Sequence, residues 1–188
     1  MDTGIYGTMT FLDVLSDGGE TDTALELLTQ PDYPGFVWQI ANGATSLWEQ
    51  WAHSGSMHSH NHGFFAGIDA SFYKYYGGVD TVEPSFRRFS VKPQLPKGIS
   101  WAGCRLYTAS GEIEVKTEYL SCGTEVKLSI PPNTSAEIWL PVPEGDFTLF
   151  DGERKQDISC FERRGKYLFG VMGSGIFRFR LVSEPYLR

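Results

Sequence analysis

The stretch EVKLSIPPNTSAEIWL, residues 125–140, decides the fold class of the second half of the chain. In an extended strand, Val126, Leu128 and Ile130 fall on one face and the intervening polar residues fall on the other. The sequence Pro131-Pro132-Asn133 is typical of a turn, and the apolar run Ala136–Leu140 follows it. We therefore expect two short strands here, separated by a turn.

Similar strand patterns occur on both sides of this stretch. Turn sequences such as Ser110-Gly111 and Glu144-Gly145-Asp146 separate them. Six or seven short strands at close spacing predict an antiparallel β-sandwich. The additional predicted strands are Phe86–Lys92, Gly111–Thr117, Phe147–Phe150, Tyr167–Val171 and Ile176–Leu181.

The first part of the chain has helical patterns instead. Apolar residues recur at helical spacing between Thr8 and Leu15, and Asp17-Gly18-Gly19 ends that segment. Thr21 or Asp22 caps a second predicted helix, which ends before Pro31. Residues 31–46 are rich in turn residues around the short apolar run Phe36-Val37-Trp38.

A third helix is predicted from about His62 to Tyr76. Its apolar residues cover almost the whole circumference, and such a helix needs neighbours on every side. Three helices of this kind do not close a core by themselves, so we expect them to be part of a larger helical assembly. The fold class is α+β, with helices first and a sandwich second.

The distribution of charge indicates a domain boundary. The net charge is −7, but residues 1–80 contain ten acidic residues and a single basic one, Lys74, whereas residues 81–188 contain 13 acidic and 15 basic residues. We therefore expect a helical domain in residues 1–80 and a β-sandwich in residues 81–188. A nucleic-acid partner is not expected, because the first part has no cluster of Lys and Arg to bind phosphates.

Composition excludes several other classes of protein. Apolar residues make up 41% of the chain and charged residues 21%, which excludes a disordered tail. No run of about 18 apolar residues exists, so a membrane span is not expected. The first residues lack a secretory signal, which predicts a cytoplasmic location for the chain as written. The three cysteines, Cys104, Cys122 and Cys160, fit reduced thiols, and one disulfide between two of them is the alternative.

The densest group of aromatic and polar residues lies in Gly43–Trp51, followed by Ser59–Gly63. Glu49 stands between Trp48 and Trp51. Indole rings pack against the C–H faces of sugars, and a carboxylate beside them is partly desolvated and able to take a proton. In the alternative interpretation, both tryptophans are core residues and Glu49 is an exposed acid at the start of a helix.

Four histidines offer a second candidate chemistry. In a strand, His58, His60 and His62 would share one face, as zinc ligands sometimes do, and His53 lies nearby. The segment is rich in Gly and Ser, however, and has no HExxH spacing. In the alternative interpretation, His62 bonds a ligand or caps the backbone. The chain also lacks a GxSxG elbow, a Walker loop and a dinucleotide fingerprint, and we expect neither a metal nor an organic cofactor.

These residues resemble the bacterial α-L-rhamnosidases of glycoside hydrolase family 78. Gly43–Trp51 is similar to their Gly-Ala-Thr-Thr-hydrophobic-Trp-Glu-x-Trp motif, with Ser46 in place of the second Thr, and Ser59–His62 is similar to their Ser-x-Asn-His sequence. Together these segments carry a resemblance that spans essentially the whole chain. The other matching segments are Thr3–Thr8, Leu27–Gln30, Tyr33–Gly35, Gly77–Val79, Phe86–Gln94, Pro131–Ala136 and Leu140-Pro141.

The resemblance implies an (α/α)₆ barrel followed by a β-sandwich, and hydrolysis of terminal α-L-rhamnose with inversion. The family's general base falls on Glu49, and its sugar-contacting histidine falls on His62, with Asn61 beside it. Trp48 and Trp51 would form the floor or wall of the pocket. The implied partner is a rhamnose-containing glycoside or oligosaccharide.

Two departures from the family shape the expected activity. The linker between Glu49 and Asn61 is shorter than usual, and His58 and His60 are atypical. The segment that bears the general acid is expected upstream of Met1, so we expect the chain alone to be inactive. We also expect it to associate as a homo-oligomer or with the missing upstream barrel half.

Two alternative functions remain open. One is a non-catalytic module whose sandwich binds carbohydrate or stabilises a partner, and the other is a small metal-dependent hydrolase that uses the histidines.

Overall fold

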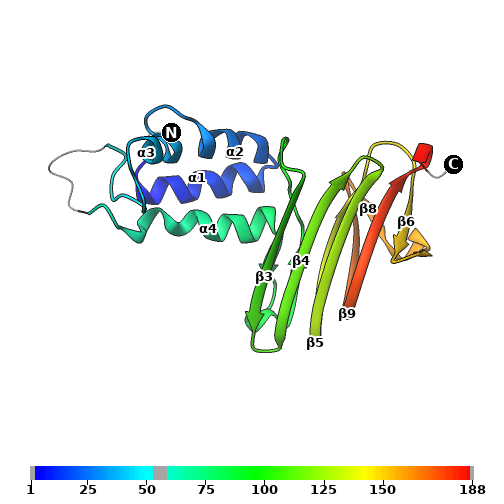
Figure 1. Ribbon diagram of the computed structural model, residues 1–188. Helices are drawn as coiled ribbons and strands as arrows, with labels where there is room; N and C mark the ends of the chain where they lie inside the picture. The colour runs from blue at the N-terminus through cyan, green and yellow to red at the C-terminus, as the bar shows by residue number, and fades with distance from the viewer. Residues whose placement is uncertain (1–2, 53–58, 187–188) are drawn as a thin grey trace. The chain divides into compact units, whose positions relative to one another are not determined.

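The computed structural model describes residues 3–52 and 59–186, and it divides the chain into two compact units, Met1–Phe72 and Tyr73–Arg188. The first unit is helical and the second consists mainly of strands (Figure 1). This arrangement confirms the predicted α+β class. None of the helices in the described part of the chain combines the length and the apolar character that a membrane span requires.

The first two helices lie where the sequence predicts them, and α1 packs against α2. Within the turn-rich residues 31–46, the apolar run that begins at Phe36 forms a six-residue helix, which was not predicted from the sequence. Phe36 packs on the core of the helical unit, which explains why this short apolar segment folds. The three helices are α1 (Ile5–Asp17), α2 (Thr21–Thr29) and α3 (Phe36–Ala41).

The helix predicted from about His62 to Tyr76 has the expected extent, but it is not a regular α-helix. The segment consists of a 3₁₀ turn η1 (Gly63–Gly67), a short helix α4 (Ile68–Ser71) and a π-helical turn η2 (Phe72–Tyr76). The side chain of Met9 lies against the backbone of Gly67, in space that a Cβ atom would need. Gly67 therefore allows α1 to pack closely against this segment.

The core of the helical unit is small. Leu12, Ala24 and Leu28 are buried, and partly buried Leu15, Phe36 and Ile68 pack around them. Large apolar side chains remain on the surface of the same unit. The most exposed of these are Tyr6 (80% exposed), Ile40 (67%) and Val14 (65%).

The second unit contains nine strands in one mixed, mostly antiparallel sheet. Short 3₁₀ turns connect some of them: η3 (Pro84–Phe86), η4 (Ile158–Cys160) and η5 (Glu184–Tyr186). The strands are β1 (Val79–Thr81), β2 (Arg88–Val91), β3 (Trp101–Thr108), β4 (Gly111–Leu120), β5 (Gly123–Pro141), β6 (Phe147–Asp151), β7 (Arg154–Lys155), β8 (Glu162–Arg164) and β9 (Tyr167–Ser183).

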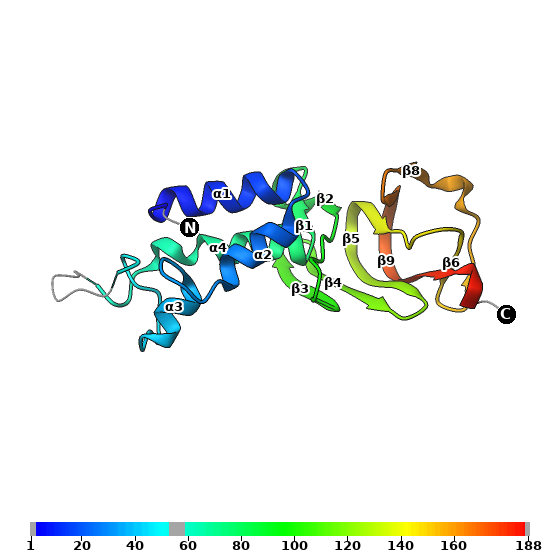
Figure 2. The same ribbon diagram turned by 90° about the horizontal axis from the view of Figure 1, so that it is seen from above.

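The two long strands, β5 and β9, fold this sheet into two layers. They pair with each other in antiparallel register, with an irregularity between Ile130 and Ser135. Before that point, β5 pairs with β4, which pairs with β3; after it, β5 pairs with β2. Figure 2 shows the bend in β5. Because β2 runs parallel to β5, the expectation of a wholly antiparallel sandwich needs correction.

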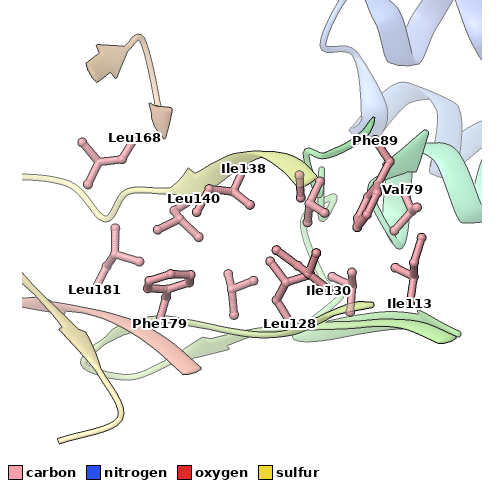
Figure 3. Packing of buried hydrophobic residues seen from close by; sticks show 14 of the residues in the cluster. Val79, Phe89, Ile113, Leu128, Ile130, Ile138, Leu140, Leu168, Phe179 and Leu181 are labelled. Atoms are coloured by element: carbon pink, nitrogen blue, oxygen red, sulfur yellow. The ribbon is translucent and has the colours of Figure 1, made fainter. Parts of the chain in front are cut away.

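The core of the second unit lies between these layers. Leu128 lies before the bend of β5, and Phe179 lies after the bend of β9. Both residues face Ile138 and Leu140 from the later part of β5 (Figure 3). Ile138 is fully buried and Leu128 is 2% exposed. The alternation of Val126, Leu128 and Ile130 that the sequence shows is therefore the inner face of one layer.

We predict that truncation of either layer destabilises the second unit. Leu128→Ala and Ile138→Ala each remove buried methyl groups and leave a cavity, which is expected to lower the free energy of unfolding by about 2–5 kcal/mol. Guanidinium unfolding followed by circular dichroism measures this loss. The control is Ile176→Ala, since Ile176 on β9 is 87% exposed and its loss is expected to cost less than about 0.5 kcal/mol. Equal losses for all three variants would contradict the two-layer core.

Candidate functional site

Trp51 is the anchor of the candidate site in the helical unit. Its side chain is 6% exposed, and its indole Nε1–H donates a hydrogen bond of 2.7 Å to the carbonyl oxygen of Thr3. The ring contacts Phe36 edge-on, with centroids 5.0 Å apart, and Phe65 in a tilted arrangement at 4.4 Å. Phe36, Trp51 and Phe65 form what we call the aromatic cluster. It fixes the backbone on both sides of Trp51.

Gln39 on α3 holds the neighbouring backbone. Its side chain is 2% exposed, and its Nε2–H donates to the carbonyl oxygen of Gln50 at 2.8 Å. The backbone carbonyl of Gln39 in turn accepts a hydrogen bond from the N–H of Ala44 at 3.0 Å. A buried amide with its partners in place restrains a loop, because breaking the bond would leave polar atoms unpaired. Glu49 therefore stands on a restrained segment.

The segment around Glu49 lies beside the segment that contains His62. The N–H of Glu49 donates to the carbonyl of Ser59 at 3.1 Å, and the N–H of His62 donates to the carbonyl of Leu47 at 2.8 Å. The hydroxyl of Ser46 also bonds the carbonyl of His60. These bonds bring together two parts of the predicted motif, and they join residues that are ten or more positions apart in the sequence.

Glu49 lines a cavity of about 340 Å³ within the helical unit. Its side chain is half-buried, and Trp51, Phe64 and Phe65 form apolar walls of the same cavity. Among the described residues that line this cavity, Glu49 carries the one carboxyl group. The volume falls at the small end of the range, roughly 300–1,000 Å³, that is typical of ligand sites.

His62 adopts a defined orientation next to this cavity wall. Its Nδ1 accepts a hydrogen bond of 3.3 Å from the N–H of Phe64, and its ring packs edge-on against the ring of Phe64 at 4.0 Å. An Nδ1 that accepts a hydrogen bond carries no proton, so neutral His62 has its proton on Nε2. The imidazole thus presents an Nε2–H donor. It also caps η1, as one sequence interpretation predicted.

The other two predicted site residues, Trp48 and Asn61, are not among those that line the cavity of Glu49. Trp48 is 4% exposed and packs edge-on against His60 at 5.4 Å, outside the residues that line the cavity of Glu49. Asn61 is exposed, and its N–H bonds the hydroxyl of Ser59. Both tryptophans are buried, as the core interpretation expects, but Glu49 is neither fully exposed nor at the start of a helix.

The metal hypothesis finds no support in the part of the chain that the structure describes. No group of three His, Cys, Asp or Glu residues is close enough there to hold a metal ion. His53 and His58 lie outside the described residues. The described thiols, Cys104, Cys122 and Cys160, are all free.

Sequence reasoning missed the residues that support Trp51 and Glu49. Gln39 and Thr3 contribute through a side-chain amide and a backbone carbonyl, and no local pattern distinguishes such contacts in advance. The apolar run that begins at Phe36 was visible in the sequence, but its contact with Trp51 depends on the tertiary fold. The aromatic residues of His62–Tyr76 were identified, although not their distribution between cavity and core.

Two family descriptions match the chain, one for each unit. The bacterial alpha-L-rhamnosidase 6 hairpin glycosidase domain matches residues 1–76, and the bacterial alpha-L-rhamnosidase C-terminal domain matches residues 78–149. Among curated proteins, the alpha-L-rhamnosidase of Alteromonas sp. (strain LOR) is 35% identical over 190 residues, covering 97% of this chain and 20% of the relative. The alpha-L-rhamnosidase of Streptomyces avermitilis is 29% identical over 154 residues, covering 78% of this chain and 15% of the relative.

Solved structures agree with these matches. The alpha-L-rhamnosidase from Dictyoglumus thermophilum superimposes with a TM-score of 0.91 at 32% identity, over 97% of this chain and 21% of that one. The Streptomyces avermitilis alpha-L-rhamnosidase, solved with L-rhamnose, gives a TM-score of 0.83 at 26% identity, over 95% of this chain and 18% of that one.

The fold and the matches define a helical unit and a β unit that are homologous to the C-terminal region of alpha-L-rhamnosidases. The chain belongs to the bacterial α-L-rhamnosidase family, in which it corresponds to the end of the six-hairpin glycosidase domain together with the C-terminal domain. It spans about a fifth of the length of the relatives it matches.

We predict that the hydrogen bond of Trp51 stabilises the candidate site. Trp51→Phe keeps an aromatic ring but removes the indole donor, so the carbonyl of Thr3 keeps only the bond of 3.2 Å from the hydroxyl of Thr8. Loss of the indole bond is expected to cost about 0.5–1.5 kcal/mol. Hydrogen exchange of the amides of α1 and α3 measures the loss, because it reports local stability in the helical unit. In the control variant, Trp101→Phe, the ring is 57% exposed and exchange in these helices is expected to stay unchanged. Equal protection in Trp51→Phe and the parent chain would refute the anchoring role.

Proposed function

We propose that this chain contributes the general base of an inverting α-L-rhamnosidase, and that Glu49 is that base. The observation that carries the proposal is the half-buried carboxyl group of Glu49 in a cavity walled by Trp51, Phe64 and Phe65. Membership of the α-L-rhamnosidase family supports it. So does the sequence Trp-Glu-x-Trp at residues 48–51, in which the tryptophan after the carboxylate is anchored.

In the proposed reaction, the carboxylate of Glu49 takes a proton from a water molecule. The water oxygen attacks the anomeric carbon of the rhamnosyl residue from the face opposite the glycosidic oxygen. The bond to that oxygen breaks as a general acid protonates it, so the leaving group departs as an alcohol and the sugar as β-L-rhamnose. Inversion requires the two carboxyl groups to be about 6.5–9.5 Å apart, which leaves room for the water.

Binding of the sugar is assigned to residues on both paired segments. The Nε2–H of His62 and the side chain of Asn61 are proposed to bond sugar hydroxyls, and the ring of Trp51 is proposed to face the C–H surface of the sugar. Trp48 does not line the cavity and is buried against His60, so it is proposed to stabilise the paired segments and not to contact the sugar. The L-rhamnose in the Streptomyces avermitilis structure supports rhamnose as the ligand.

The general acid is proposed to come from outside the 188 residues. Among the described residues of the cavity, no second carboxyl group accompanies Glu49. General acid catalysis contributes a factor of about 10²–10⁴ to the rate, so a chain with the base alone is expected to be inactive.

Exposed apolar residues on the helical unit, such as Tyr6 and Ile40, are proposed to contact the rest of the barrel or a second copy of the chain.

A chimera tests the role of Glu49. In it, this chain replaces the matching fifth of the Dictyoglumus thermophilum α-L-rhamnosidase. The chimera is expected to hydrolyse p-nitrophenyl α-L-rhamnoside, and Glu49→Gln is expected to lower its kcat by about 10²–10⁴, because glutamine cannot accept the proton of the water. The KM is expected to change little.

The matched control is Glu26→Gln, which changes an exposed carboxylate on α2 and should leave kcat unaltered. The 188-residue chain alone, assayed in parallel, should release no p-nitrophenol. Near-parental kcat for Glu49→Gln in the active chimera would rule out the assignment of the base.

A further inference from the structure

The largest cavity among those described lies in the β unit, away from Glu49. It has a volume of about 480 Å³ and opens at one end of the sandwich. β4 and β9 both terminate at this end (Figure 1). A cavity of this size falls within the range of small-molecule sites, roughly 300–1,000 Å³.

The bends of the long strands explain why a cavity forms there. Both ends of β5, at Gly123 and Pro141, line it, and so do both ends of β9, at Tyr167 and Ser183. Each strand starts in one layer, bends in the middle and returns in the other layer to the same end of the sandwich. The two layers separate at this end, and the inner face that is packed with apolar residues further inside becomes accessible to solvent.

Several polar side chains at this cavity are unpaired among the residues that the structure describes. In the described part of the chain, Gln94, Ser121, Glu144 and Ser183 make no side-chain hydrogen bond or ion pair. They come from four separate segments, yet they converge on one cavity. An amide, two hydroxyls and a carboxylate supply both donors and acceptors, which are the groups that bind the hydroxyls of a sugar.

Two tyrosines add an aromatic wall. Tyr119 on β4 is 41% exposed, whereas Tyr167 on β9 is 6% exposed, and its hydroxyl donates to the carbonyl of Pro93 at 3.1 Å. Burial, with a further contribution from Tyr119, raises the pKa of Tyr167, so its phenol stays protonated at neutral pH. An aromatic face next to hydrogen-bonding groups suits a ligand that has one apolar face and a polar rim.

The charges of the lining select against ionic ligands. Glu144 and Lys166 carry opposite charges, and they are the two charged residues among those that line the cavity in the described chain. An anion or a cation would therefore meet no excess of opposite charge. A purely apolar ligand would desolvate Gln94 and the serine hydroxyls without pairing them, which costs free energy.

We propose that this cavity of the β unit is a second binding site, for a neutral saccharide. The site involves no residue of the helical unit, so it does not depend on Glu49. Only the choice of a rhamnose-containing probe rests on the proposed function. Such a site would hold a sugar unit of an oligosaccharide on the β unit without cleaving it.

Titration of the full ¹⁵N-labelled chain with the neutral disaccharide rutinose, an α-L-rhamnosyl-glucose, tests the proposal. Saturable shifts are expected for the amides of Tyr119–Thr124 and Lys166-Tyr167. Tyr119→Ala removes the exposed aromatic wall, and Gln94→Ala removes an unpaired amide; each is expected to raise the Kd about tenfold or more. Gln94→Ala breaks no side-chain hydrogen bond within the described chain, so it remains informative if Tyr119→Ala destabilises the fold.

Two controls separate this site from other binding. Tyr107→Ala removes a tyrosine of β3 that is 79% exposed, and it should leave the Kd unchanged. Glu49→Gln should also leave it unchanged, so failure of the proposed catalytic role would not alter this result. The absence of saturable shifts at these amides would overturn the proposal, as would shifts confined to the surroundings of Glu49 or an unchanged Kd in both Tyr119→Ala and Gln94→Ala.

Discussion

The backbone hydrogen bonds between Leu47–Glu49 and Ser59–His62 are the constraint on which the candidate site depends. They align two segments that are distant in sequence, and the indole of Trp51 anchors one of these segments to Thr3, just before α1, and to Phe36 on α3. Without this alignment, Glu49 and His62 would be two polar residues on separate loops. With it, a proton acceptor and a hydrogen-bond donor stand on neighbouring segments, beside a cavity with apolar walls. This arrangement is the physical basis for proposing glycoside chemistry.

Pairing between distant segments also determines which parts of the fold could be predicted from the sequence and which could not. The alternation in Glu125–Ile130 correctly identified an inner face, but Pro131-Pro132-Asn133 is an irregularity within β5 and not the end of a strand. Local rules cannot distinguish the two cases, because the partner strand β9 decides whether the chain reverses or bends. β3 was missed, since Trp101 and Tyr107 point to solvent and the strand has no alternation of apolar and polar residues.

The sequence was sufficient to predict the motif of the candidate site, but not the arrangement of its residues in space. Glu49 and Trp51 stood out because a carboxylate between indoles is chemically suggestive and because the surrounding residues resemble a known family. Gln39 carried no such signal, although it is fully enclosed and fixes the carbonyl of Gln50. Its role depends on a contact across the fold. The cavity of the β unit could not be predicted from the sequence either, because it forms where the ends of two bent strands meet.

Chemical rescue by azide distinguishes a Glu49 that activates the attacking water from a Glu49 that only supports the structure. In the chimera, Glu49→Gly removes the base and leaves space beside the anomeric carbon. Azide needs no base, so we expect it to restore cleavage of p-nitrophenyl α-L-rhamnoside and to give β-L-rhamnosyl azide, identified by NMR. If azide restores no activity, or if the azide product retains the α configuration, Glu49 is not the base of an inverting reaction.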